Sequence, residues 1–98
     1  MIELPIAACG LDAAGMREQG ARYARLGEHV ARRTREPRLL EVVFDAGVDR
    51  ALLEETARVE RGCCSFFGIE VEGRRLRMTV ADDAQDPALD AIAAALAL

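Results

Sequence analysis

The chain has 98 residues, a net charge of −4 and 51% hydrophobic residues, which together describe one domain with enough apolar side chains for a core. It shows neither an apolar run near the ~20 residues of a membrane span nor a basic, apolar leader segment, so we expect a cytoplasmic protein. An acidic chain with only 4% aromatic residues is unsuited to nucleic-acid binding. Three cysteines in an intracellular chain are typical of thiols, metal ligands or a redox pair, not of a disulfide framework.

Residues 2–10 (IELPIAACG) predict a short edge strand or an extended lead-in, because Pro5 is tolerated only in such places. The next segment predicts a helix from Ala13 to Arg35, which Asp12 can cap and which Pro37 ends. Its apolar residues recur at helical spacing: Met16, Tyr23, Leu26 and Val30. It also contains three glycines, which favour the close approach of another element: Gly15, Gly20 and Gly27.

Residues 38–46 (RLLEVVFDA) predict a strand with one apolar face: Leu40, Val42 and Phe44. A second helix starts at Asp45 or Asp49 and ends near the paired cysteines. Its apolar stripe is Val48, Leu52, Val59 and Cys63. One step around the same helix lie Leu53, Ala57 and Cys64.

Residues 65–81 (SFFGIEVEGRRLRMTVA) predict a β-hairpin with Glu72 and Gly73 in a two-residue turn. That register gives three facing pairs, with the charged pair on the opposite side from the apolar ones: Ile69 and Leu76, Phe67 and Met78, Glu70 and Arg75. A final helix follows, with Asp86 as its N-cap and Pro87 at its first position. Its apolar face is Leu89, Ile92, Ala93 and Leu96.

The predicted element order is (β)αβαββα. It describes an α+β fold with a short antiparallel sheet of three strands, or four if residues 2–10 form one, and helices packed on one face. The order differs from the βαββαβ pattern of ferredoxin-like metal carriers. Because a short open sheet leaves exposed edges, a homodimer is a further expectation.

Adjacent cysteines, Cys63 and Cys64, are the most informative feature of the sequence. Cysteine packs well as a small hydrophobe, and Cys63 continues an apolar stripe, so core packing is one interpretation. Adjacent side chains diverge by about 100° on a helix, but at a helix end the backbone can turn and bring two thiols together. Two thiolates suit a thiophilic ion such as copper(I), zinc, mercury(II) or arsenic(III).

Two further residues could complete such a site. If the N-terminal segment crosses the end of the second helix, Cys9 would supply a third sulfur, as in trigonal mercury(II) or arsenic(III) sites or zinc sites. Glu60 could add an oxygen ligand for zinc. Arg61 would favour a thiolate, whereas Glu60 and the negative end of the helix dipole would oppose it. This opposition disfavours a catalytic nucleophile more than a metal site, because a cation itself drives deprotonation.

Other residue types give no candidate site. His29 is expected to be solvated or to cap a helix, Tyr23 to lie in the core, and Ser65 lacks both a base and a nucleophile-elbow context. No catalytic or cofactor-binding residue is therefore predicted, and an enzyme is not the favoured interpretation.

The two cysteine segments, residues 6–11 (IAACGL) and 60–66 (ERGCCSF), resemble the pattern I-A-C-x-L … E-R-x-C-C-x-F of a group of small bacterial proteins of unassigned function. The matching positions are Ile6, Ala7, Cys9, Leu11, Glu60, Arg61, Cys63, Cys64 and Phe66. An extra Ala8 shifts the first motif, and Gly68 or Ile69 replaces a later aromatic residue. The resemblance implies that Cys9 belongs with Cys63 and Cys64 in one pattern.

Three functions are therefore weighed. The favoured one is a small binder of a soft metal or metalloid ion through Cys9, Cys63 and Cys64, with Glu60 as a further ligand. The second is a dithiol redox protein that forms a Cys63–Cys64 or Cys9–Cys64 disulfide. The third is a non-catalytic structural or interaction module whose cysteines only pack the core.

Overall fold

A computed structural model describes residues 11–97 of the chain, so the predicted strand at residues 2–10 and Cys9 lie outside the described residues. Its elements are α1 (Ala13–Gly27), β1 (Val30–Glu36), β2 (Leu39–Phe44), α2 (Arg50–Cys63), β3 (Gly68–Glu72), β4 (Arg75–Thr79), the 3₁₀ turn η2 (Asp83–Gln85) and α3 (Asp86–Ala95). Four antiparallel strands form one open sheet in the order β1-β2-β4-β3. The predicted α+β class is confirmed.

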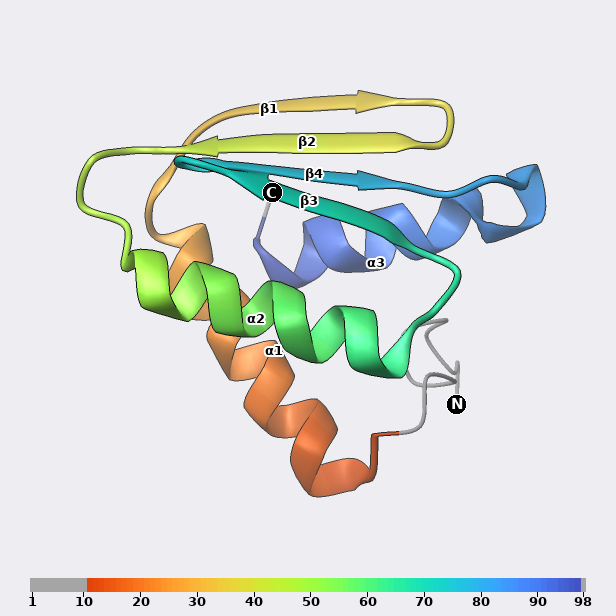
Figure 1. The fold of residues 1–98 in the computed structure, drawn as a ribbon, viewed down its shortest axis with the longest axis horizontal. Helices are drawn as coiled ribbons and strands as arrows, with labels where there is room; N and C mark the ends of the chain where they lie inside the picture. Colours follow the sequence, from red (N-terminus) through yellow and green to blue (C-terminus); the bar gives the residue numbers. More distant parts are fainter. Residues whose placement is uncertain (1–10, 98) are drawn as a thin grey trace.

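The three helices lie together on one face of the sheet, as predicted (Figure 1). β2 lies inside the sheet and turns its apolar residues toward the helices: Leu40, Val42 and Phe44, each at most 1% exposed. This alternation follows from the two-residue period of a strand. The core therefore lies between the sheet and the helix layer, with α1 packed against both α2 and α3.

The predicted first helix is too long. α1 ends at Gly27, and residues 30–36 form β1, which pairs with β2 around Pro37 and Arg38. Arginine and glutamate are good helix formers, so the residue preferences of this segment predict a helix. Its strand conformation depends on the pairing with β2. Tyr23 and Leu26 are buried as predicted. A Cβ on Gly27 would lie 2.2 Å from the carbonyl oxygen of Leu96, which confirms a close approach at this glycine.

The predicted hairpin exists, but its register is wrong. The turn residues are Gly73 and Arg74, and the facing pairs are Ile69 and Met78, Glu70 and Arg77, Val71 and Leu76, Glu72 and Arg75. Gly73 has φ of 60°, and a first central turn residue with positive φ is what a type II′ turn requires. Moving the turn by one residue shifts the pairing by two, so Ile69, Leu76 and Met78 keep the face that was predicted for them.

Asp49 caps α2 as one of the two predicted candidates, since its carboxylate accepts a hydrogen bond from the Leu52 backbone N–H at 3.1 Å. The buried face of the helix is rotated from the predicted stripe: it consists of Leu53, Thr56, Ala57 and Glu60. Leu52, Val59 and Cys63 are only half-buried beside it. Because of this rotation, the polar residues Thr56 and Glu60 lie in the interior.

Asp86 does not cap α3, contrary to the prediction. Gln85 occupies the N-cap position without a side-chain hydrogen bond. The Asp86 carboxylate instead accepts hydrogen bonds from Arg35 Nη2 at 2.7 Å and from the Arg38 backbone N–H at 2.6 Å. Asp86 therefore ties the start of α3 to the β1–β2 turn. The predicted apolar face of α3 is confirmed at Leu89, Ile92 and Leu96, all fully buried.

We expect Asp86→Asn to lower the free energy of unfolding at neutral pH. Hydrogen bonds from Arg35 and Arg38 hold the pKa of the Asp86 carboxyl below its ordinary value of 3.8. A carboxyl with a lowered folded-state pKa stabilises the fold above its ordinary pKa and loses that contribution as pH falls through the folded-state pKa. The difference in the free energy of unfolding between parent and variant should thus shrink on acidification in a urea-unfolding series.

Asp90→Asn, which removes a more exposed Arg35 partner, is the control and should lower the free energy of unfolding less. A difference that does not change with pH contradicts this assignment.

Candidate metal centre

The paired cysteines lie where α2 ends. Cys63 is the last helical residue, and Cys64 is the C-cap, with φ of −125° and ψ of 83°, outside the helical region. This change of backbone direction turns the Cys64 side chain back toward its neighbour, so that the two sulfur atoms lie 3.8 Å apart. The predicted convergence of the two adjacent cysteine sulfurs at a helix end is confirmed. At this distance no disulfide joins Cys63 to Cys64, because such a bond measures about 2.05 Å.

The two cysteines differ in burial. Cys64 is 1% exposed and belongs to the apolar core, whereas Cys63 is a free, half-buried thiol at its edge. Cys64 thus fits the packing interpretation in part. Packing does not account for the polar groups that surround the sulfur atoms.

Glu60 lies one turn before Cys64 and is fully buried. Its Oε1 atom accepts hydrogen bonds from the Tyr23 hydroxyl at 2.6 Å and from Gln19 Nε2 at 3.2 Å. Its Oε2 atom accepts a hydrogen bond from the Cys63 thiol, with the oxygen 3.8 Å from the sulfur. The Gln19 amide is itself fixed, because Nε2 also donates to the Thr56 carbonyl at 3.0 Å. Two α1 side chains therefore hold one oxygen of the carboxylate, and the Cys63 thiol donates to the other.

The buried carboxylate has no cationic partner within residues 11–97, since none of the ion pairs found there includes Glu60. Burial raises the pKa of Glu60, and the hydrogen bonds from Tyr23, Gln19 and Cys63 offset this only in part. Burial, followed by the charge of Glu60, also raises the pKa of Cys63, to about 11. Burial and the same charge hold the pKa of Tyr23 well above its usual value. The site therefore favours the protonated forms of its own groups.

From its position in the sequence, Arg61 was expected to favour a thiolate. In the structure its side chain instead hydrogen-bonds a backbone carbonyl. Its Nε and Nη2 atoms donate hydrogen bonds to the Ile69 carbonyl at 3.2 and 3.1 Å. Arg61 therefore links the end of α2 to the start of β3.

Three of the four predicted ligands come together in the structure. The ligand atoms of Glu60, Cys63 and Cys64 all lie within 4.8 Å of one another. A tetrahedral zinc ion with bonds of about 2.3 Å to sulfur spaces two thiolates about 3.8 Å apart, which is the distance between the two cysteine sulfurs. This geometry is compatible with metal binding. The fourth predicted ligand, Cys9, lies outside the described part of the chain.

Sequence reasoning missed the polar partners of the site. Tyr23 was expected only as a core residue, and Gln19 was not singled out. Both lie on one face of α1, four residues apart, and Thr56 and Glu60 have the same spacing on α2. The signal in the sequence is therefore a pair of polar residues at helical spacing on the core-facing side of each helix.

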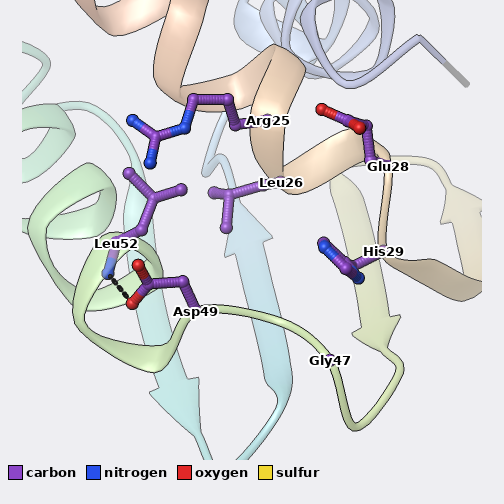
Figure 2. Close-up of a pocket in the computed structure, with 7 residues that line it drawn as sticks. All are labelled: Arg25, Leu26, Glu28, His29, Gly47, Asp49 and Leu52. Carbon is purple, nitrogen blue, oxygen red and sulfur yellow. Dashed lines mark hydrogen bonds between the residues drawn. The ribbon is translucent and has the colours of Figure 1, made fainter.

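A concave site lies between the end of α1 and the loop that leads into α2 (Figure 2). It has a volume of about 150 Å³ and is lined by Arg25, Leu26, Glu28, His29, Gly47, Asp49 and Leu52. His29 Nδ1 lies 3.0 Å from Asp45 Oδ1, an atom that also accepts the Gly47 N–H at 2.8 Å. These contacts hold the loop in place. The volume of this site is below the ~300 Å³ at which ligand pockets begin, so it is not a candidate ligand site.

The chain forms a small α+β fold with a buried carboxylate and two adjacent cysteine sulfurs at one helix end. No protein-family model matches it, and no significant match is found among curated proteins or solved structures. Within residues 11–97, no helix combines the length and the hydrophobicity needed to cross a membrane.

Proposed function

We propose that the reduced protein binds a thiophilic metal or metalloid ion through Cys9, Cys63 and Cys64, with Glu60 as an additional ligand. The observation that carries this proposal is the cluster at the end of α2, where one carboxylate oxygen and two sulfurs lie within 4.8 Å of one another. Sulfur ligands select soft and borderline ions. A cation there would also neutralise a carboxylate that is buried without an ion-pair partner among the described residues, which is otherwise costly.

Thiol catalysis is supported less well by the same environment. A nucleophilic or redox-active cysteine works as the thiolate and is found beside groups that lower its pKa. Cys63 instead lies beside Glu60, and its pKa is raised to about 11. A metal ion overcomes this obstacle because it displaces the proton on binding.

The test is native mass spectrometry of protein purified under reductant and mixed with one equivalent of zinc, cadmium or mercury(II). We expect one ion bound to each chain and a thiolate-to-metal charge-transfer band in the ultraviolet. Cys63→Ser and Cys64→Ser should each weaken binding strongly, and Cys9→Ser should abolish tight binding. The matched control is Ser65→Ala, which changes an exposed side chain next to the pair.

Each alternative gives a different result in this experiment. Unchanged binding by Cys9→Ser would overturn the three-sulfur site. Failure of the parent to bind any of the ions would remove metal binding altogether. A reversible loss of two mass units on mild oxidation, without ion binding, would identify a dithiol redox protein. A Cys63→Ala, Cys64→Ala variant that keeps every property except a few kcal/mol of stability would identify packing.

A further inference from the structure

We propose that the face of the sheet turned away from the helices docks a second copy of this chain, with a two-fold axis along the strands. The three helices cover the other face, and no element of residues 11–97 lies on this one (Figure 1). This outer face is on the opposite side of the sheet from α2 and its cysteines. The order of charges across its four strands makes it complementary to itself.

Two rows of side chains cross the outer face. On β2, Glu41 and Val43 alternate with the buried Leu40 and Val42, and therefore point away from the helices. Residues that pair across antiparallel strands share a face, so the strand pairing extends each of these two residues into a row in the order β1-β2-β4-β3. One row is Thr34, Glu41, Arg77 and Glu70, and the other is Arg32, Val43, Arg75 and Glu72.

Most charged residues in these rows have no ion-pair partner in their own chain. Arg75 pairs with Glu72 at 3.0 Å. Arg32, Glu41 and Arg77 take part in none of the ion pairs found within residues 11–97. Arg32 and Arg77 are exposed, and Glu41 is half-buried. The outer face therefore presents charges of both signs in a fixed order, which disfavours a partner of one sign such as nucleic acid.

A two-fold axis along the strands brings β1 over β3 of the second copy and β2 over its β4. Because such an axis keeps every row over the same row, Glu41 lies over Arg77 of the second copy and Arg32 over its Glu72. Each of these opposite-charge pairs forms twice by symmetry. The remaining charged residues of the two rows lie over uncharged ones, so no like charges meet.

The other symmetric way to stack the two outer faces is less favourable. A two-fold axis across the strands would lay each strand over itself. Centred on the same row, it would bring Glu41 against Glu41 and Arg77 against Arg77, and like charges that face each other across an interface repel. The axis along the strands is therefore the one that the charges select.

The sheet edges, from which the sequence predicted a homodimer, are less suited to pairing than the outer face. At the edge strand β3, the Ile69 carbonyl already accepts two hydrogen bonds from Arg61. At the other edge, β1 carries the exposed Arg32 and Arg33, and charged side chains of this kind on an edge strand oppose edge-to-edge pairing.

The size of the outer face sets the strength of the dimer. Four strands about 4.8 Å apart and about five residues long, with a rise of about 3.3 Å for each residue, cover roughly 300 Å² in projection. A standard interface buries about 800 Å² on each partner, so the dimer should be weak and should depend on its ion pairs. Because salt screens exposed charges, the dimer should weaken further as the ionic strength rises.

Analytical ultracentrifugation of the full chain at low salt, with a chelator present, measures the dimer from micromolar to millimolar protein concentration. Glu41→Arg and Arg77→Glu each place like charges at two points of the interface, so each should weaken the dimer by about tenfold or more. Glu54→Arg is the control. It changes the net charge by the same amount as Glu41→Arg, but on an exposed position of α2, and it should leave the dissociation constant within about twofold of the parent value.

An equimolar mixture of the Glu41→Arg and Arg77→Glu chains separates the interface from the stability of the fold. In the mixed dimer both positions again face an opposite charge, so the mixture should dimerise like the parent although neither variant does so alone. Far-ultraviolet circular dichroism checks that each variant is folded. Arg32→Glu and Glu72→Arg repeat the test at two exposed positions, so misfolding of the first pair does not decide the result.

Three outcomes would each overturn the inference: a parent that stays monomeric at millimolar concentration, single variants that dimerise like the parent, and folded variants whose mixture does not recover. A dimer that disappears when reductant is added would be an intermolecular disulfide and would overturn it too. Ion binding at the end of α2 is a separate measurement, and neither of its results changes the expected dimer.

Discussion

Gly27→Ala is expected to destabilise the protein by about 2–3 kcal/mol, the upper part of the range for overpacking a filled site. An added Cβ would lie 2.2 Å from the carbonyl oxygen of Leu96 and 2.9 Å from its carbonyl carbon. These are backbone atoms at the end of α3, so they cannot rotate away as a flexible side chain could. Leu96 is also fully buried, and any retreat of α3 would open the core. The loss is a large part of the ~5–15 kcal/mol that stabilises a domain.

Gly20→Ala, in the same helix, is the matched control for Gly27→Ala. A Cβ at Gly20 would meet nothing within 4 Å, so the variant should gain up to about 1 kcal/mol from the better helix propensity of alanine. Denaturant unfolding followed by circular dichroism measures both changes. Shifts of the same sign in the two variants would show that the end of α3 does not press on Gly27 in solution.

Much of the fold was predictable because its patterns are local. The two-residue alternation of Leu40, Val42 and Phe44 identifies β2, and the helical spacing of Leu89, Ile92 and Leu96 identifies α3. Each pattern depends only on neighbours along the chain. The boundary between α1 and β1 was not predictable in the same way, because residues 30–36 are mostly charged and good helix formers. Their strand conformation comes from pairing with β2, a contact that single-residue preferences do not encode.

The hairpin shows a second limit of local patterns. Both the predicted and the observed registers place an opposite-charge pair and an apolar pair across the strands, so the pattern alone does not separate them. The choice is made by Gly73, whose φ of 60° fits the first central turn position. One turn residue thus decides which arginine faces Glu70.

The candidate site, too, was predictable from local patterns only in part. That Cys63 and Cys64 converge follows from their position at the end of a helix, which the sequence places correctly. The roles of Gln19 and Tyr23 depend on contacts with residues 37 to 41 positions away along the chain. Only the packing of α1 against α2 brings these side chains to Glu60. A buried acidic residue with two fixed donors is therefore a feature that the fold reveals and a single helix does not.

Saturation with Zn²⁺ is expected to raise the thermal unfolding midpoint of the reduced protein by about 10–20 °C. An ion that binds only the folded state adds about 2.7 kcal/mol at a concentration one hundred times its Kd. For a domain of about 60–100 residues, each kcal/mol shifts the midpoint by about 4–8 °C. One contribution to this gain comes from the carboxylate of Glu60, which is buried without an ion-pair partner within residues 11–97 and which a cation would neutralise.

Calorimetry with and without a chelator measures the Zn²⁺-dependent shift. Glu54→Gln should reproduce the parent shift, whereas Cys63→Ser and Cys64→Ser should lose most of it. Glu60→Gln should be at least as stable as the parent without metal, because it removes a buried charge and keeps the acceptor for Tyr23 and Gln19. With Zn²⁺ it should gain less than the parent does. An equal Zn²⁺-dependent shift in Cys63→Ser would place the ion elsewhere on the protein and would remove the end of α2 as its site.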